Sequence, residues 1–222
     1  MTALLPAVEI EPTQPATHSI IWMHGLGADG HDFEPIADEL PLPAHMQLRF
    51  VFPHAPAIPV TINNGYVMRA WYDILDFSDL HRTVDEAGIT RSRHAIEALV
   101  AREIARGIPS ERIFLAGFSQ GGVMAYNVGL SYPQKLAGII ALSTYLPNAA
   151  QLDAQLSPAN QHTPVFAAHG TLDPVVNLRL GDVARQHVTQ LGHPVSWHTY
   201  PMQHSVCMEE VQALGRWLGE HA

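Results

Sequence analysis

The sequence has one cysteine, few charged residues and no long apolar run. The single Cys207 cannot form a disulfide within the chain, which agrees with a reducing compartment. Twelve Lys and Arg residues against 21 Asp and Glu residues give a formal net charge of -9. This charge disfavours nucleic acids and anionic membranes as partners, because both would require a basic face. No run approaches the ~18 apolar residues of a membrane-spanning helix, so we expect a soluble, cytoplasmic protein.

The 14 histidines of the chain lack the spacing of metal ligands. Neither a His-Glu-x-x-His motif nor a pair of Cys-x-x-Cys motifs is present, so we predict no metal site. The chain has 222 residues, of which 47% are hydrophobic. This length is sufficient for one well-buried core and short for two, and we expect a single domain over residues 1–222.

The most informative segment is Gly-Phe-Ser-Gln-Gly at residues 117–121. An apolar run at residues 113–116 precedes it, and residues 122–130, rich in Ala, Val, Met and Leu, follow it. A strand, a sharp turn with serine at its apex and then a buried helix form the arrangement called the nucleophile elbow. The serine adopts strained backbone angles there, and glycines beside it let the strand and the helix approach closely. The segment therefore indicates Ser119 as a nucleophile.

An acid and a histidine follow Ser119 in the order expected of a Ser-Asp-His triad. Asp173 lies in the turn after the apolar run at residues 165–170, and His204 lies in the loop after the alternating run at residues 195–200. Both residues therefore leave the carboxyl ends of expected strands, where parallel sheets place their ligand sites. Four other histidines compete with His204. His187 falls in an expected helix and His193 in a turn, while His198 falls in a strand and His221 at the end of the chain. Position thus selects His204 as the base.

Apolar patterns over the rest of the chain indicate an α/β fold, with a mostly parallel sheet covered by helices on both faces. Further strands are expected at residues 19–23, 48–52 and 138–142. Helices are expected at residues 33–40 and 183–191, along the stripe of Ile96, Leu99, Val100 and Ile104, and along that of Val211, Leu214 and Leu218. Residues 53–76 are the exception, because this apolar stretch carries several prolines and a glycine. We expect a long ordered loop there that contributes to binding.

A glycine-rich loop, His-Gly-Leu-Gly-Ala-Asp-Gly, occupies residues 24–30 after the strand expected at residues 19–23. It contains G-x-G-x-x-G, the pattern of dinucleotide-binding proteins. That pattern needs an acidic residue at the end of the next strand, and residues 48–52 run into Pro53 without one. The favoured interpretation is an oxyanion hole, in which the N-H groups of Leu26 and Gln120 bind the carbonyl oxygen of a substrate. No cofactor is then required.

Together these segments resemble the carboxylesterase and acyl-protein thioesterase (lysophospholipase-like) family, most of all its small bacterial carboxylesterases. The likeness covers nearly the whole chain and rests on residues 24–27, 59–61, 71–73, 117–122, 142–143, 169–170, 173–174 and 204–207. The resemblance implies a compact α/β-hydrolase fold without a large cap domain, which hydrolyses carboxylic esters and, as a variant, thioesters. It also assigns the triad to Ser119, Asp173 and His204, and the oxyanion donors to Leu26 and Gln120.

The resemblance further implies that the loop after the second strand shapes an acyl groove. Ile62, Met68 and Trp71 would then lie near the substrate, with Val175 beside Asp173. Ordinary packing of the loop is the alternative for the first three.

Three residues near these motifs need separate interpretation. Arg69 and Ala70 stand where many relatives have Pro-Ser, which would add a positive charge at the rim of the groove. Cys207 lies near His204 but belongs to no elbow, and we expect it to pack as a small apolar residue.

The main hypothesis is an esterase that acts on short to medium acyl esters, with lipidated proteins or lysophospholipids as alternative substrates. A peptidase of the prolyl-oligopeptidase type shares the triad order, but such enzymes usually bring a large second domain that this chain is too short to contain. A ligand-binding protein that has lost catalysis is a third alternative, although no triad residue is missing. The acyl chain length stays open, and so does a homodimer.

Overall fold

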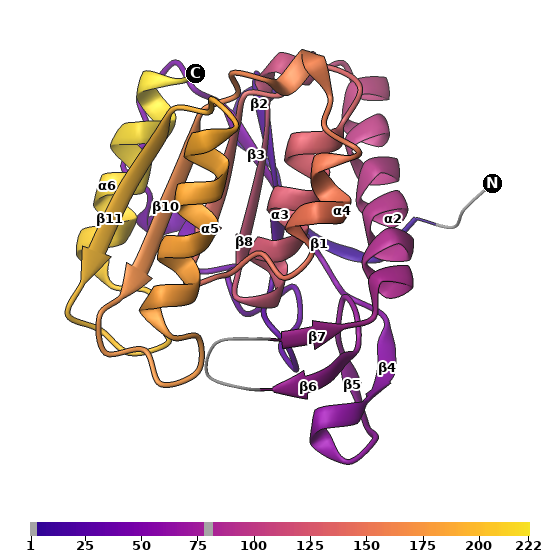
Figure 1. The fold of residues 1–222 in the computed structure, drawn as a ribbon. Helices are drawn as coiled ribbons and strands as arrows, with labels where there is room; N and C mark the ends of the chain where they lie inside the picture. Colours follow the sequence, from indigo (N-terminus) through magenta and orange to yellow (C-terminus); the bar gives the residue numbers. More distant parts are fainter. Residues whose placement is uncertain (1–3, 78–81) are drawn as a thin grey trace.

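A computed structural model describes residues 4–77 and 82–222, and its centre is a seven-stranded sheet (Figure 1). The strand order is β1-β3-β2-β8-β9-β10-β11, and every neighbouring pair is parallel except β1 with β3. The inner strands are buried along nearly their whole length, which is why their sequences are continuously apolar. The strands span β1 Ala7–Ile10, β2 His18–Met23, β3 Leu48–Pro53, β8 Ile113–Phe118, β9 Gly138–Leu142, β10 Val165–Gly170 and β11 Val195–Tyr200.

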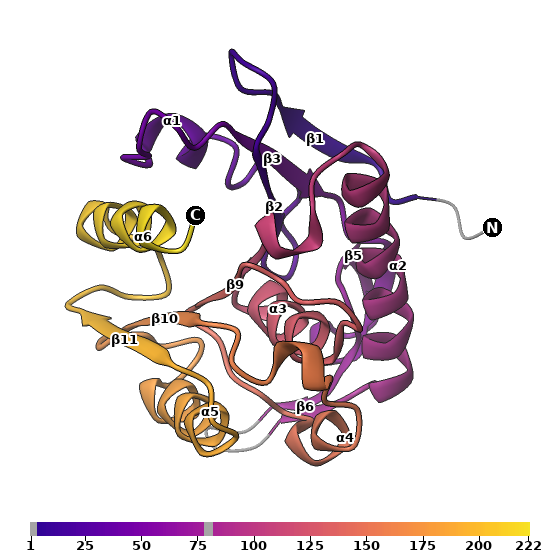
Figure 2. The same ribbon diagram turned by 90° about the horizontal axis from the view of Figure 1, so that it is seen from above.

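Helices cover both faces of the sheet (Figure 2). One face carries α2 Glu86–Ala105, α3 Gln120–Ser131, α4 Ala149–Asp153 and α5 Leu178–Gln190, and the other carries α1 Ile36–Glu39 and α6 Met208–Glu220. Alternate residues of β2 enter the two cores: Ile21 joins the one beneath α2 and α3, and Ile20 joins the one beneath α6. The expected α/β architecture with a mostly parallel sheet is confirmed, and the described residues contain no large cap domain.

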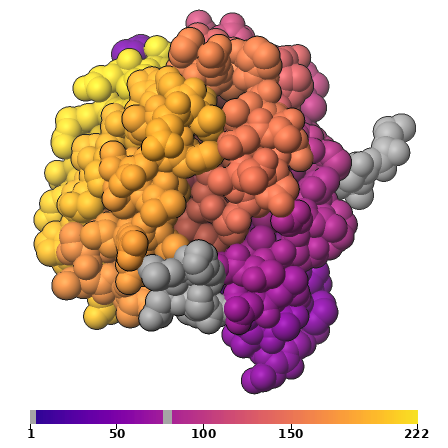
Figure 3. Space-filling model, in the orientation of Figure 1, coloured from indigo at the N-terminus to yellow at the C-terminus, as the bar shows by residue number. Residues whose placement is uncertain are grey.

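Two sequence-based expectations need correction. The helix expected at residues 33–40 is a single turn, Ile36–Glu39, because Leu40 precedes Pro41 and adopts extended angles that end the helix. The loop expected at residues 53–76 contains strands: β4 Ala57–Val60 pairs with β5 Tyr66–Arg69, and β6 Ile74–Phe77 pairs with β7 Arg82–Val84. The β4–β5 hairpin projects from the end of the molecule at which the parallel strands finish (Figures 1 and 3).

Three short 3-10 helices complete the elements of the described residues. The first, η1 Thr61–Asn63, joins β4 to β5; η2 Ser110–Arg112 precedes β8, and η3 Pro158–Asn160 precedes β10. None of the described helices is both long and apolar enough to cross a bilayer.

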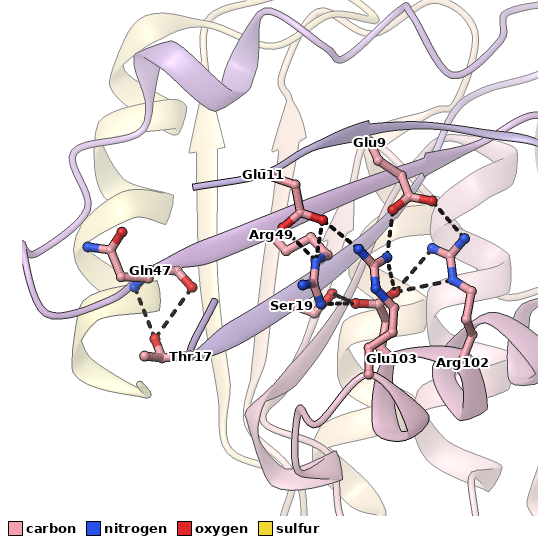
Figure 4. A network of polar contacts seen from close by, with 9 residues as sticks. Glu9, Glu11, Thr17, Ser19, Gln47, Arg49, Arg102 and Glu103 are labelled. Carbon is pink, nitrogen blue, oxygen red and sulfur yellow. Dashed lines mark hydrogen bonds and ion pairs between the residues drawn. The ribbon is translucent and has the colours of Figure 1, made fainter. Parts of the chain in front are cut away.

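A buried ion-pair network ties the first strand to helix α2 (Figure 4). The fully buried carboxylate of Glu103 pairs with Arg49, Arg102 and Arg106, and the hydroxyl of Ser19 donates a further hydrogen bond of 3.0 Å to it. Glu9 of β1 binds the outer arginines, Arg102 and Arg106. Because Ser19 and Arg49 stand near the starts of β2 and β3, the network lies at the amino ends of the parallel strands. It is thereby separated from the end where the hairpins lie.

Candidate active site

Ser119 occupies a strained turn between β8 and α3. Its backbone angles are φ 54° and ψ -118°, a conformation that residues other than glycine rarely adopt. Glycines on either side allow this turn to close. A Cβ atom on Gly117 would lie 2.1 Å from the carbonyl oxygen of Gly121, and one on Gly121 would lie 2.2 Å from that of Met23. The glycines are therefore required by close backbone approach, as the motif predicts.

The neighbouring strand holds the turn in place. The Ser119 N-H donates to the carbonyl oxygen of Leu142 at 2.9 Å, and the Thr144 hydroxyl donates to the Ser119 carbonyl oxygen at 2.6 Å. Leu142 is the last residue of β9, and Thr144 lies just beyond it. Sequence reasoning did not single out Thr144, because a threonine after a strand has no signal of its own.

Asp173 and His204 lie together although 31 positions separate them in the sequence. The His204 Nδ1 donates to Asp173 Oδ2 at 2.7 Å. Burial raises the pKa of Asp173, but the hydrogen bond from His204 and those from the Val176 and Val175 N-H groups outweigh it, and the net pKa is lowered. Asp173 is therefore a carboxylate at neutral pH, in the position to fix one tautomer of the imidazole.

The competing histidines have other partners. His187 pairs with Asp153, His193 with the carbonyl oxygen of Thr163, and His221 with that of Trp217, while His198 stacks on Phe166. The structure thus brings His204 to Asp173 and leaves the others elsewhere.

A cavity of about 270 Å³ lies beside Ser119 and His204. Ser119 and His204 both line it, and the ring of His204 packs 4.7 Å from that of Phe118. No hydrogen bond links Ser119 Oγ to His204 among the described contacts, and such bonds often tighten only when a substrate is bound. Leu26 and Gln120 line the same cavity, and neither backbone N-H donates to another described residue. Two free N-H groups beside a serine can bind a negatively charged oxygen.

His24 fixes the glycine-rich loop that carries Leu26. Its Nδ1 donates to the carbonyl oxygen of Gly25 at 2.7 Å, and its Nε2 accepts from the Ala55 N-H at 3.0 Å. Burial lowers the pKa of His24 to about 4, so the ring is neutral and can fill both roles. Its neutral ring thus braces the loop against the end of β3.

The four residues expected along the acyl groove are placed differently from one another. Ile62 and Val175 line the cavity, whereas Met68 and Trp71 are absent from its lining. Trp71 is only 2% exposed, and its backbone N-H donates to the side-chain oxygen of Gln120 at 2.8 Å. Met68 packs behind the glycine-rich loop, where its sulfur lies 3.7 Å from a Cβ position on Gly27.

A larger cavity of about 510 Å³ adjoins the first and shares Arg82 and Tyr145 with it. The Arg82 guanidinium lies 4.4 Å from the centre of the Tyr145 ring and donates to the carbonyl oxygen of Val175. Arg69, expected at the groove rim, lines neither cavity and donates to the carbonyl oxygen of Ala55 at 2.8 Å. A positive side chain therefore borders the groove, but from a different position in the sequence.

Cys207 lies outside both cavities and precedes helix α6 as its N-cap. Burial raises the pKa of its thiol, which keeps it protonated at neutral pH and makes it a poor nucleophile.

Comparisons with known proteins identify the family of the chain. The model of the phospholipase/carboxylesterase family matches residues 6–222. Acyl-protein thioesterase 1 of Neurospora crassa is 43% identical over 213 residues, which cover 92% of this chain and 86% of that protein. The crystal structure of SOBER1 from Arabidopsis thaliana superposes with a TM-score of 0.86 at 30% identity, and covers 92% of this chain and 98% of that one.

A Bacillus cereus carboxylesterase is 18% identical, with a TM-score of 0.81 over 100% of this chain and 96% of that chain, and shares the fold alone. The family resemblance seen in the sequence is thus confirmed. This chain belongs to the phospholipase/carboxylesterase family and is a hydrolase with the α/β fold of that family.

Proposed function

We propose that this protein is a serine hydrolase that cleaves carboxylic esters of short to medium acyl chains. Ser119 is the nucleophile, His204 the general base and Asp173 the residue that orients it. The observation that carries the proposal is the 2.7 Å bond between Asp173 and His204, beside a serine at a strained elbow that opens into the same cavity. This is the constellation that acyl transfer through a covalent intermediate requires.

In the proposed reaction, Ser119 Oγ attacks the acyl carbon while His204 Nε2 takes its proton. The Leu26 and Gln120 N-H groups stabilise the oxyanion, each contributing about 3 kcal/mol to the transition state. His204 returns the proton to the leaving alcohol, and water then hydrolyses the acyl-enzyme by the same steps. The lowered pKa of Asp173 keeps its carboxylate charged, and this charge stabilises the imidazolium formed at each step.

Apolar side chains define the proposed acyl site. Ile62 and Val175 face the catalytic cavity, and its volume of about 270 Å³ is at the small end for ligand pockets. That size supports short to medium chains, and the adjoining cavity extends the space beyond Tyr145.

A second candidate is hydrolysis of thioesters on acylated proteins, or of lysophospholipids. The name of the Neurospora crassa relative, an acyl-protein thioesterase, supports the first of these. The same constellation serves both bonds, because attack at the acyl carbon and oxyanion stabilisation do not depend on whether oxygen or sulfur leaves. We also propose a cytoplasmic location, which the single cysteine of the chain supports.

The test is reaction with a fluorophosphonate and with p-nitrophenyl esters of graded chain length, together with the matching acyl thioesters. Wild type should be labelled and active, and Ser119→Ala should lose both. Ser143→Ala is the matched control, because Ser143 also has positive φ at the end of a neighbouring strand. Absence of labelling in the wild type would refute the proposal of a serine hydrolase, and activity in Ser119→Ala would refute the assignment of Ser119 as the nucleophile. The ratio of thioester to ester turnover decides between the two candidates.

A further inference from the structure

A separate cavity of about 430 Å³ lies at the opposite end of the sheet from Ser119. It is lined by residues at the start of β2, by the turn before β8 and by the end of α6, and Figure 1 shows that the strands start and α6 ends at this side of the molecule. The proposed hydrolase reaction uses none of its residues.

Basic side chains from separate segments converge on this cavity. They are His18, His45, Arg112, Lys135 and His221. The one acidic side chain among the described residues that line the cavity is that of Glu111. Neither Arg112 nor Lys135 forms an ion pair with any residue that the structure describes, although the chain as a whole has a net charge of -9. A concave site lined by cations without ion-pair partners is therefore locally positive in a protein whose overall charge is negative.

The charged groups at the cavity also act on His18. His18 is buried, and burial is the largest cause of its lowered pKa; the charges of Arg112 and His45 lower it further. The guanidinium of Arg112 is thus close enough for its charge to act on His18. A bound anion would offset that charge, because neither Arg112 nor Lys135 has an ion-pair partner among the described residues.

We propose that this cavity binds a phosphate dianion, either free or as the phosphate group of a larger molecule. The guanidinium of Arg112 can bind two phosphate oxygens at once, while the ammonium of Lys135 acts as a point charge. The Thr17 hydroxyl and the Nδ1 atoms of His18 and His221 already form hydrogen bonds within the protein, so the Nε2 atoms of these two imidazoles are the ring positions left for a ligand. Because the site lies at the other end of the sheet, it stands independently of the proposed ester hydrolysis.

Calorimetric titration of the protein with inorganic phosphate tests the proposal. The double variant Arg112→Gln/Lys135→Gln should bind phosphate at least about tenfold more weakly than wild type. The control variant Arg91→Gln/Arg216→Gln removes the same charge from exposed residues that line neither this cavity nor the two beside Ser119, and it should bind as wild type does. No saturable binding to wild type, or an equal loss in the control, would overturn the proposal. Ester hydrolysis by both double variants should be unchanged, which separates this outcome from the fate of the catalytic proposal.

Vesicles distinguish a free phosphate from a lipid headgroup. If the natural source is a headgroup, vesicles that contain phosphatidic acid should retain the wild type, and inorganic phosphate should compete for it. If the source is a small molecule, the vesicles should not retain the protein while phosphate still binds. Both outcomes support the cavity, whereas vesicle binding that survives in Arg112→Gln/Lys135→Gln would place the contact elsewhere and refute it.

Discussion

The indole nitrogen of Trp71 donates a hydrogen bond of 2.8 Å to the carbonyl oxygen of His24. That oxygen belongs to the residue that begins the glycine-rich loop, so Trp71 supports the loop from within the protein. The Trp71 backbone N-H also binds the side chain of Gln120, whose own N-H is the second proposed oxyanion donor. One buried residue is therefore hydrogen-bonded to both segments that form the proposed oxyanion hole.

We predict that Trp71→Phe lowers kcat by about tenfold to the same extent for all acyl chain lengths, because it loosens the oxyanion hole. Ile62→Ala should instead change the chain-length preference, since Ile62 lines the cavity. Steady-state kinetics with acetyl to dodecanoyl esters would separate the two effects. A change of chain-length preference in Trp71→Phe would assign it to the groove after all.

We predict that Asp173→Asn lowers kcat by about 10³–10⁴-fold without unfolding the protein, because an amide cannot hold the reactive tautomer of His204. The surface pair of Asp153 with His187, at 2.8 Å, provides a matched control. Asp153→Asn should keep full activity. Circular dichroism would verify folding, and comparable losses in both variants would mean that the effect is not catalytic.

We predict that Glu210→Gln stabilises the protein at alkaline pH. Burial raises the pKa of Glu210 from 4.5 to about 8, and the nearby backbone of Cys207 only partly opposes this, because neither side-chain oxygen forms a hydrogen bond of good geometry with a described residue. The folded form thus holds a proton that the unfolded form has lost. Between these pKa values, the free energy of unfolding of the wild type falls by about 1.4 kcal/mol per pH unit as pH rises.

Urea denaturation at pH 5.5 and pH 8.5 would measure this difference. The gain from Glu210→Gln should be larger at pH 8.5, whereas the exposed neighbour Glu209→Gln should give no such pH dependence. Equal gains at both pH values would show that Glu210 is charged in the folded protein.

We predict that Glu103→Gln destabilises the fold by about 3–5 kcal/mol, because it leaves Arg49, Arg102 and Arg106 without their buried partner. Glu9→Gln, at the partly exposed edge of the same network, should cost less. Activity per folded molecule should be unchanged in both, since the network lies at the amino ends of the strands. Chemical denaturation together with fluorophosphonate titration would check this.

We predict that Gly121→Ala destabilises the protein more than Gly107→Ala does. A Cβ on Gly121 meets backbone at 2.2 Å, which cannot move aside without disturbing the elbow. Gly107 has φ 97° but nothing within 4 Å of a Cβ, so its substitution costs only the strain of the left-handed conformation, about 1 kcal/mol. Thermal unfolding of the two variants would rank them, and an equal shift would indicate that the elbow relaxes.

The strands and the positions of Ser119, Asp173 and His204 could be predicted from local signals. Each of these residues follows an apolar run, and parallel strands bring their carboxyl ends to one edge whatever the length of chain between them. Trp71 was beyond such reasoning, because an aromatic residue in an apolar stretch looks the same whether it faces a cavity or a loop. Periodicity also overestimated the helix around Ile36, since it does not register that Pro41 ends the turn.

The Glu103 network and the orphan Glu210 could not be anticipated for a different reason. Both depend on contacts between segments far apart in sequence, and an acidic residue on a helix ordinarily indicates an exposed face. Only the packing of α2 against β2 and β3 shows that Glu103 is enclosed.

Ile62 reaches the cavity from the tip of the β4–β5 hairpin, while Ser119 stands on the sheet. In the proposed reaction, Ile62 would contribute to acyl selectivity from a hairpin that carries none of the residues that react. Exchange of residues 57–69 between relatives should then change the preferred acyl length without removing catalysis, so that substrate range could diverge within the family through this one segment.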